Sequence, residues 1–460
     1  MTGEDKIQDL ELTRSVMNSG ELRQLCVDLW RRTRIDWSFA GAGLQAALRA
    51  RPGLNSTTRR WLAEVVYGLI RHLRRVDAGL AAGGVRATTG VSEELRIITF
   101  LMLEGPLTPQ DAVHHSANIR AARDVDWQAV AAVDPSIDAE RKRWRRVALK
   151  CSLPDWLAKR LAADLGDQAL AFGTAVNRRG PVWLRANVQV NSAAELAAAL
   201  AAEGIDTTPG RHASNALRVH GHPDLRRLGL FARGAFELQD EASQVVAELA
   251  FAPGVAAGDE AKPMLVDYCA GAGGKTLAWA SRLGNRGRLI ACDTDPRKLA
   301  ELRKRARRAN ASNIRTLVLD PTTHTDIDEL RDSARCVLVD APCSGLGALR
   351  RHPETRWRLS AADIDRLSKL QARILADASA LVAPGGVLLY ATCTVLRAEN
   401  SRVVDNFLSA HRTFALRPVT DVWPERAPLI SDTGGNCVQM TPHQHDTDGF
   451  FAAVLQRATV

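Results

Sequence analysis

The stretch Met264-Leu-Val-Asp-Tyr-Cys-Ala-Gly-Ala-Gly-Gly-Lys-Thr276 predicts a strand, a glycine-rich turn and the start of a helix. An apolar run ends at Asp267, and glycines in the following turn let the backbone approach a ligand closely. The first turn of the next helix offers free amide donors. We therefore expect a ligand-binding turn at the carboxyl edge of a parallel sheet.

The next strand narrows the choice of ligand. It ends at Asp293, 22 residues after Gly271, where a carboxylate can accept hydrogen bonds from both hydroxyls of a ribose. The spacing is not that of a P-loop, because four residues do not separate the first glycine from a Gly-Lys-Ser/Thr ending. Asp320 and Asp340 follow the third and fourth strands, although each, taken alone, could equally cap a turn. An adenosine ligand without a triphosphate fits best.

Apolar runs alternate with helical or loop segments from about residue 236 onward. Such alternation implies right-handed crossovers and a parallel sheet, so the predicted fold class is α/β. The expected strands are Met264–Asp267, Arg288–Cys292, Ile314–Leu319, Cys336–Val339 and Val387–Ala391.

Two other regions precede this one. Residues 1–150 carry apolar positions at helical spacing and predict an all-helical domain. Residues 151–235 change to short alternating units, with a helix whose start is fixed by the capping-box spacing of Ser192 and Glu195. We expect a small α+β domain there, followed by a third domain over residues 236–460.

Composition limits the classes of protein to consider. The 460 residues are 46% hydrophobic and carry a formal charge of +9, which makes a polyanionic partner plausible. The eight cysteines form no Cys-x-x-Cys pair, so neither a metal site nor a disulfide framework is expected. No signal peptide or membrane-spanning run is apparent, and we expect a cytoplasmic protein.

Two cysteines follow apolar runs directly. Cys343 lies in Asp340-Ala-Pro-Cys-Ser-Gly and Cys393 lies in Ala391-Thr-Cys-Thr. Free cysteine is usually a small buried hydrophobe, so packing is the plainer explanation for an isolated pair. Ligands bind at the carboxyl ends of parallel strands, however, and thiols placed there are candidates for chemistry.

The chain resembles, over nearly its whole length, the RsmB/Sun family of S-adenosyl-methionine-dependent RNA cytosine-5 methyltransferases. Residues 340–357, from Asp340-Ala-Pro-Cys-Ser-Gly-Leu-Gly to Arg350-Arg-His-Pro-Glu-Thr-Arg-Trp, resemble the family's fourth motif. Residues 389–395, with Glu399-Asn400 downstream, resemble its sixth motif, and Asp448-Gly-Phe-Phe-Ala resembles its closing strand. Tyr67-Gly68-Leu-Ile-Arg71 is similar to the family's NusB-like RNA-binding domain.

The resemblance implies a fold, an activity and a set of site residues. The implied fold is a Rossmann-like class I methyltransferase domain with a mostly parallel seven-stranded sheet, preceded by a ferredoxin-like α+β domain and a NusB-like helical domain. The implied cofactor is S-adenosyl-methionine. Its expected ligands are Cys269, Ala270, Gly271, Ala272, Gly273, Gly274, Lys275, Asp293, Asp320 and Asp340.

The implied reaction forms 5-methylcytosine in RNA, with small-subunit ribosomal RNA as the family's usual target. Cys393 would attack carbon 6 of the base, Cys343 would help to release the product, and Asp340 would hold the cytosine edge. Four residues near the fourth motif are expected to contact the RNA backbone at the entry to the site, with a structural ion-pair role as the alternative. They are Arg350, Arg351, His352 and Arg356.

Two departures from the family pattern stand out. The cofactor loop usually reads Ala-Pro-Gly-Gly-Lys, and here Gly271-Ala272 replaces Ala-Pro, so we expect a looser turn that still binds cofactor. The residue after the second cysteine is usually serine, and Thr394 preserves its hydroxyl.

Other functions are still to be weighed. A catalytically silent RNA-binding assembly factor would keep the fold and the pocket. A DNA cytosine-5 methyltransferase would place its nucleophile in Pro342-Cys343 and typically continue with glutamine, whereas Ser344 follows here. We expect a monomer with no obligate protein partner.

Overall fold

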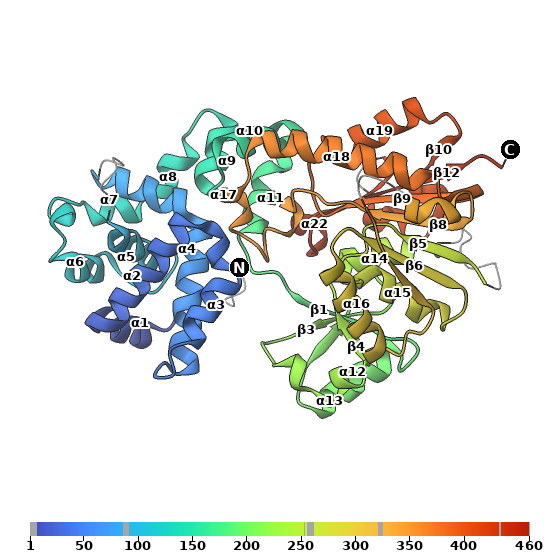
Figure 1. Ribbon diagram of the computed structural model, residues 1–460. Coiled ribbons are helices and arrows are strands. Elements are labelled where there is room, and N and C mark those ends of the chain that lie inside the picture. The colour runs from blue at the N-terminus through green and yellow to red at the C-terminus, as the bar shows by residue number, and fades with distance from the viewer. Residues whose placement is uncertain are drawn as a thin grey trace. The chain divides into compact units, whose positions relative to one another are not determined.

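The computed structural model describes residues 7–85, 92–252, 254, 262–320, 325–431 and 434–459 (Figure 1). Contacts divide the chain into two compact units. The helical unit comprises Met1–Arg179 together with Ala348–Ala361, and the sheet unit comprises Gly180–Gly347 together with Ala362–Val460.

The helical unit is built around the long helix α4 (Ser56–Ala82). Its apolar face packs against α5 (Glu93–Leu103), whose residues from Leu95 to Met102 are all buried. Helix starts follow local chemistry, as in α6 (Pro109–Ser116), where Thr108 and Asp111 form a capping box. The other helices are α1 (Leu10–Asn18), α2 (Gly20–Ile35), α3 (Ala42–Arg49), α7 (Trp127–Ala131), α8 (Val133–Asp138), α9 (Arg143–Lys150), α10 (Asp155–Leu165), α11 (Ala169–Val176) and α17 (Thr355–Arg358).

A segment that follows Cys343 along the chain folds into the helical unit. In this segment, residues 348–361, Trp357 stacks on Trp37 with ring centroids 5.6 Å apart, and its indole N–H donates to the carbonyl of Ile70. Arg356 is fully buried and donates to the carbonyl of Cys151 at 3.0 Å and to Asn177 Oδ1 at 2.6 Å.

These contacts correct the expected role of Arg356. Its guanidinium is 0% exposed and satisfies carbonyl groups inside the helical unit, so it cannot contact RNA from this position. Burial lowers its pKa to about 9. Arg350 is also buried and donates to the carbonyl of Arg179, whereas Arg351 is half-buried and His352 is exposed. RNA contacts by Arg350, Arg351 and His352 remain a prediction.

The sheet unit begins with a small antiparallel sheet in the order β2-β3-β1-β4. Ser192 and Glu195 form the predicted capping box at the start of α12 (Ala193–Ala202), which packs on this sheet. The other elements of this part are β1 (Val182–Ala186), β2 (Thr207–Pro209), β3 (Ala216–Val219), α13 (Gly229–Ala232) and β4 (Phe236–Leu238).

The large sheet has the order β10-β12-β9-β8-β5-β6-β7, and β11 pairs with β12 beside this path. β5 to β9 run parallel, and β12 is antiparallel to β9, β10 and β11. The strands are β5 (Met264–Asp267), β6 (Arg288–Asp293), β7 (Ile314–Val318), β8 (Ala334–Asp340), β9 (Val382–Thr392), β10 (Phe414–Arg417), β11 (Val438–Met440) and β12 (Phe450–Arg457).

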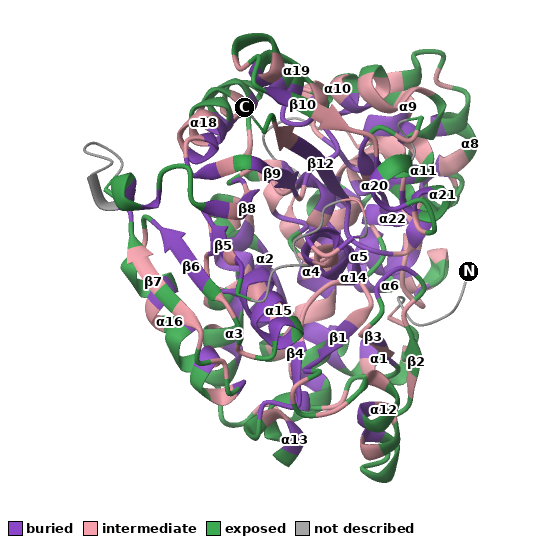
Figure 2. Ribbon diagram, turned by 90° about the vertical axis from the view of Figure 1, so that its right-hand side faces the viewer, coloured by how far each residue is buried: buried purple, intermediate pink, exposed green. Residues whose placement is uncertain are grey.

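Helices cover both faces of the large sheet, whose strands β5, β8 and β9 are coloured largely as buried in Figure 2. One face packs against α14 (Glu241–Leu249) and α15 (Gly274–Leu283). The other packs against α18 (Ala361–Ser379) and α19 (Ser401–Ala410). The remaining helices are α16 (Pro296–Arg308), α20 (Val419–Val422), α21 (Ala427–Ile430) and α22 (Pro442–His445).

The predicted α/β class and mostly parallel sheet are confirmed. The seven strands of the continuous path match the expected number, and β11 adds a short eighth strand. The domain boundaries remain a prediction; the region expected to begin the α+β domain starts with α10 and α11, which group with the helical unit. In the part of the chain that the structure describes, no helix has the length and apolarity needed to span a bilayer.

The buried Arg356 generates a stability prediction. Arg356→Ala removes the donors that satisfy the carbonyl of Cys151 and Asn177 Oδ1, so we expect the free energy of unfolding of the helical unit to fall by about 3 kcal/mol. Denaturant unfolding followed by circular dichroism measures it. The matched control is Arg358→Ala, at an exposed position of the same helix, which should cost under about 0.5 kcal/mol. Equal losses in the two variants would contradict the prediction.

Candidate active site

The parallel pairing of β8 and β9 brings Cys343 and Cys393 together. Asp340 pairs with Ala391 across the two strands, and the amide of Ala341 donates to the carbonyl of Ala391 at 2.8 Å. The loops that follow β8 and β9 then leave the sheet at the same edge. The two sulfur atoms lie 3.3 Å apart as free thiols, and the amide of Cys393 donates to Cys343 Sγ at 3.3 Å.

The two thiols have unequal surroundings. The hydrogen bond with Cys393, followed by burial, raises the pKa of the Cys343 thiol well above its usual value. A thiol with a raised pKa holds its proton at neutral pH and is a weak nucleophile. Cys343 therefore holds its proton at neutral pH.

An ion pair lies at the end of β8, three residues before Cys343. Lys275 Nζ, which is buried at the start of α15, lies 2.5 Å from Asp340 Oδ2. The same Nζ lies 5.0 Å from the ring centroid of Phe450. Since the lysine fixes one carboxylate oxygen, Asp340 presents the rest of its partly exposed carboxylate in a defined orientation.

The segment before β12 packs against the Cys343 loop. A Cβ atom on Gly347 would lie 2.0 Å from the carbonyl oxygen of Gly449, so only glycine permits this approach. The amide of Gly347 donates to the carbonyl of Cys393, and the amide of Gly449 donates to the carbonyl of Gly347, both at 2.9 Å. Three segments distant in sequence therefore meet at the thiols.

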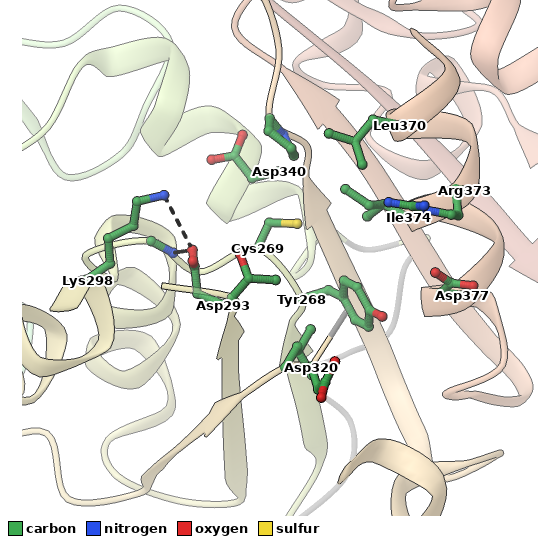
Figure 3. Close-up of a pocket in the computed structure, with 14 residues that line it drawn as sticks. Tyr268, Cys269, Asp293, Lys298, Asp320, Asp340, Leu370, Arg373, Ile374 and Asp377 are labelled. Atoms are coloured by element: carbon green, nitrogen blue, oxygen red, sulfur yellow. Dashed lines mark hydrogen bonds and ion pairs between the residues drawn. The ribbon is translucent and has the colours of Figure 1, made fainter. Parts of the chain in front are cut away.

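A cavity of about 360 Å³ opens at the carboxyl edge of the sheet (Figure 3). This volume lies in the usual range for a site that holds a small molecule or cofactor. Its lining consists of Tyr268, Cys269, Gly271, Asp293, Thr294, Lys298, Leu319, Asp320, Asp340, Pro342, Leu370, Arg373, Ile374 and Asp377.

The structure brings part of the predicted cofactor site together here. Cys269, Gly271, Asp293, Asp320 and Asp340 line the cavity. The other expected ligands do not line the cavity. Ala270 is in the core, Gly273 is the N-cap of α15, and Lys275 pairs with Asp340. The carbonyl of Ala272 accepts a hydrogen bond from Arg305, and the carbonyl of Gly274 accepts one from Arg185.

Asp293 supports the glycine loop directly. Its Oδ2 accepts from the amide of Gly271 at 2.9 Å, and its Oδ1 accepts from the amide of Asp295 at 2.8 Å. Lys298 Nζ lies 3.9 Å from the same carboxylate (Figure 3). At the base of the loop, burial raises the pKa of Asp267 to about 7, while Thr276 Oγ1 donates to its Oδ2.

Sequence reasoning missed one wall of the cavity. Leu370, Arg373, Ile374 and Asp377 lie on α18 at positions i, i+3, i+4 and i+7 (Figure 3). That spacing marks one face of a helix and is visible in the sequence. It does not reveal that the face borders a ligand cavity, because the cavity forms only when α18 packs beside β8. Five further lining residues are close in sequence to predicted site residues but were not themselves predicted. They are Tyr268, Thr294, Lys298, Leu319 and Pro342.

The described residues contain no cluster of side chains suited to bind a metal ion. No group of three or more His, Cys, Asp or Glu side chains there could hold a metal ion.

The divergent loop generates a second stability prediction. Gly271 has φ +56°, a left-handed conformation that costs an alanine about 1 kcal/mol, although a Cβ would meet no atom within 4 Å. We expect Gly271→Ala to lower the free energy of unfolding of the sheet unit by about 1 kcal/mol through this strain alone. Denaturant unfolding measures the change.

Gly274→Ala is the matched control, because Gly274 is the first residue of α15 and its Cβ would make only an ordinary contact, 3.6 Å from Gln239 Nε2. It should not destabilise the unit, since alanine favours a helix. A Gly271→Ala variant as stable as the Gly274→Ala variant would contradict the account of the loop.

Comparisons with known proteins agree with this geometry. Residues 257–456 match the family model described as 16S rRNA methyltransferase RsmB/F, and residues 153–226 match the RsmF/B-like ferredoxin-like domain. The ribosomal RNA small subunit methyltransferase B of Xanthomonas campestris is 32% identical, over 91% of this chain and 94% of the relative. The protein of the same name from Xylella fastidiosa is 32% identical, over 89% of this chain and 87% of the relative.

Solved structures show the same fold. The crystal structure of PH0851 superimposes with a TM-score of 0.70 at 24% identity, over 94% of this chain and 97% of that chain. A methyltransferase homolog protein from Pyrococcus horikoshii gives a TM-score of 0.57 at 24% identity, over 69% of this chain and 100% of that chain. With a large sheet that ends in a cofactor-sized cavity and paired thiols, and with relatives that match along nearly their whole length, the chain belongs to the RsmB/F family of methyltransferases, whose cofactor is S-adenosyl-methionine.

Proposed function

We propose that this protein transfers a methyl group to carbon 5 of a cytosine in small-subunit ribosomal RNA. The observation that carries the proposal is the pair of free thiols, 3.3 Å apart, next to Asp340 at the border of the cofactor cavity. The names of the relatives from Xanthomonas campestris and Xylella fastidiosa support ribosomal RNA as the substrate.

The residues of the cavity fit S-adenosyl-methionine. Asp293 would hold the ribose hydroxyls, since its carboxylate ends β6 beside the glycine loop. Asp320 lies after β7 and would face the adenine, while the loop from Cys269 to Lys275 would bring backbone groups to the rest of the ligand. The bound cofactor supplies an electrophilic methyl group.

The paired thiols suit a reaction at carbon 5 of cytosine. Carbon 5 of cytosine is a poor nucleophile until another group adds at carbon 6, and a thiolate suits that addition. We assign the addition to Cys393. Cys343 would act afterwards, either as the base that removes the carbon 5 proton or by assisting elimination. The raised pKa of Cys343 supports leaving the addition to the other thiol, because a thiol that holds its proton is a weak nucleophile.

Asp340 is suited to recognise the base. A carboxylate accepts hydrogen bonds from the exocyclic amine of cytosine, whereas uracil presents a carbonyl at the same position. Lys275 fixes one oxygen of Asp340 and leaves the other side of the carboxylate open. The target cytosine must leave any stack to reach this group, which costs a few kcal/mol in a duplex and less in a loop. We therefore propose an exposed RNA segment as the substrate.

The direct test of the function is nucleoside analysis. We expect the purified protein, incubated with unmodified small-subunit ribosomal RNA and S-adenosyl-methionine, to produce 5-methylcytidine, measured by mass spectrometry of the digested RNA. Binding of the cofactor without methylation of the RNA would favour the silent assembly factor. Methylation of DNA but not RNA would favour the DNA enzyme.

The roles of the two cysteines are tested by separate alanine variants. We expect Cys393→Ala to abolish methylation, because no thiol can then add at carbon 6. We expect Cys343→Ala to accumulate a covalent protein–RNA adduct, because addition still occurs while release is impaired. A shifted band on a denaturing gel reports the adduct. A band that persists in Cys393→Ala and is absent from Cys343→Ala would reverse the assignment.

A further inference from the structure

We propose that Glu399 and Asn400 are positioning residues that hold the two cysteine loops in register for the reaction. The inference deepens the proposed function and rests on it for its catalytic consequence. Glu399 is 0% exposed and Asn400 is 2% exposed, and both lie in the turn between β9 and α19. Neither side chain lines the cofactor cavity.

The carboxylate of Glu399 holds the Cys343 loop. Its Oε1 accepts from the amide of Ser344 at 2.8 Å, and its Oε2 lies 2.6 Å from the hydroxyl of the same residue. Two hydrogen bonds to one residue fix both its backbone and its side chain. Because Ser344 follows Cys343 directly, the position of the first thiol depends on a carboxylate supplied 55 residues later in the chain.

The same hydroxyl connects the two cysteine loops. Ser344 Oγ lies 2.9 Å from Thr394 Oγ1, and Thr394 follows Cys393 directly. A hydroxyl carries one proton and a carboxylate can only accept, so Ser344 donates to Glu399 and accepts from Thr394. The threonine that replaces the family's serine therefore uses its hydroxyl in this chain of hydrogen bonds.

Asn400 holds the Cys393 loop from both sides. Its Oδ1 accepts from Thr392 Oγ1 at 2.6 Å, and its Nδ2 donates to the carbonyl of Thr394 at 3.0 Å. These partners flank Cys393. Two consecutive residues thus restrain the neighbours of both thiols, Glu399 through Ser344 and Asn400 through Thr392 and Thr394.

Helix α18 connects this network to the wall of the cavity. Gln371 Nε2 donates to Glu399 Oε1 and to the carbonyl of Pro342, both at 3.0 Å. Gln371 is fully buried, and its neighbour Leu370 lines the cavity. The three groups that donate to the Glu399 carboxylate are neutral, so the network depends on hydrogen-bond geometry rather than on a counter-ion.

Positioning of this kind has a large effect on rate. A displacement of about 1 Å between reacting groups can cost about 100-fold in rate. In Glu399→Gln, an amide nitrogen at the Oε1 position would face the N–H donors of both Ser344 and Gln371. At the Oε2 position it would donate to the Ser344 hydroxyl, which would then donate to Thr394 and deprive the Thr394 hydroxyl of its acceptor. In either orientation at least one donor that links the loops loses its acceptor, without a change in side-chain volume.

The experiment combines two readouts on the full-length protein. The first is the rate at which diamide, a two-electron oxidant, joins Cys343 and Cys393 in a disulfide; both thiols lose their protons and diamide becomes the hydrazine. Peptide mass mapping follows this pair separately from the other cysteines. The second is the single-turnover rate of 5-methylcytidine formation. Melting temperature and the dissociation constant for S-adenosyl-methionine report the fold and the cavity.

We expect Glu399→Gln to slow disulfide formation at least about tenfold and methyl transfer about 100-fold, with the cofactor dissociation constant changed by less than about threefold. Ser344→Ala removes the hydroxyl but keeps the hydrogen bond from the backbone amide of residue 344 to Glu399, so it should slow both reactions by a smaller factor. The matched control is Glu241→Gln, because Glu241 is also a buried carboxylate of the sheet unit that accepts from two amides, those of His212 and Ala213. It should leave both rates within about twofold.

Glu399→Gln rates within about twofold of wild type would overturn the proposal. It would also be overturned if Glu399→Gln and Glu241→Gln slowed both reactions equally at equal loss of melting temperature, since Glu399 would then be only structural. A wild-type protein that forms no 5-methylcytidine would refute the proposed function, while the disulfide rates would still decide whether Glu399 positions the thiols.

Discussion

The parallel pairing of β8 with β9 is the constraint on which the site depends. It places Asp340 opposite Ala391, so that the loops carrying Cys343 and Cys393 leave the sheet at one edge. Both strands are central in the sheet, and helices cover both of their faces. A change of register by one residue would turn the buried side chains of β9 toward the wrong layer and separate the thiols. Packing of the core on both faces of the sheet therefore holds the two thiols close together.

Buried hydrogen bonds hold the two cysteine loops in place at the ends of β8 and β9. The strand pairing brings the loops near each other, but the loops themselves are held by buried carboxylate, amide and hydroxyl groups from Glu399, Asn400 and Ser344. Each of these hydrogen bonds restrains the loops, because a lost partner would leave an unpaired polar group in a poorly solvated place. Helix α18 contributes to the network through Gln371 and to the cavity through Leu370, so the thiols and the cofactor site share one support.

The sequence predicted those parts of the fold that depend on local pattern. Five apolar runs gave β5 to β9, with β5 matching Met264–Asp267 at both ends, and the capping box of Ser192 gave the start of α12. The strands β4, β10 and β11 were missed. Strands of three or four residues leave too little pattern to detect, and their pairing is decided by partners elsewhere in the chain.

Long-range packing explains the errors at the site. Arg356 follows a motif of the active site in sequence, and only the structure reveals that its partners are Cys151 and Asn177 in the helical unit. The face of α18 that borders the cavity has ordinary helical spacing, so its function depends on where the helix packs. The closeness of Cys343 and Cys393, by contrast, could be predicted, because both follow strands that a parallel sheet places side by side.

The most direct test of the unequal roles of the thiols uses RNA that contains 5-fluorocytidine at the target position. Fluorine at carbon 5 prevents the final loss of a proton, so the wild-type protein should remain covalently attached to the methylated base. Tandem mass spectrometry of the trapped peptide identifies the attached residue. We expect a bond from Cys393 to the base, with Cys343 free. A bond from Cys343 would contradict it.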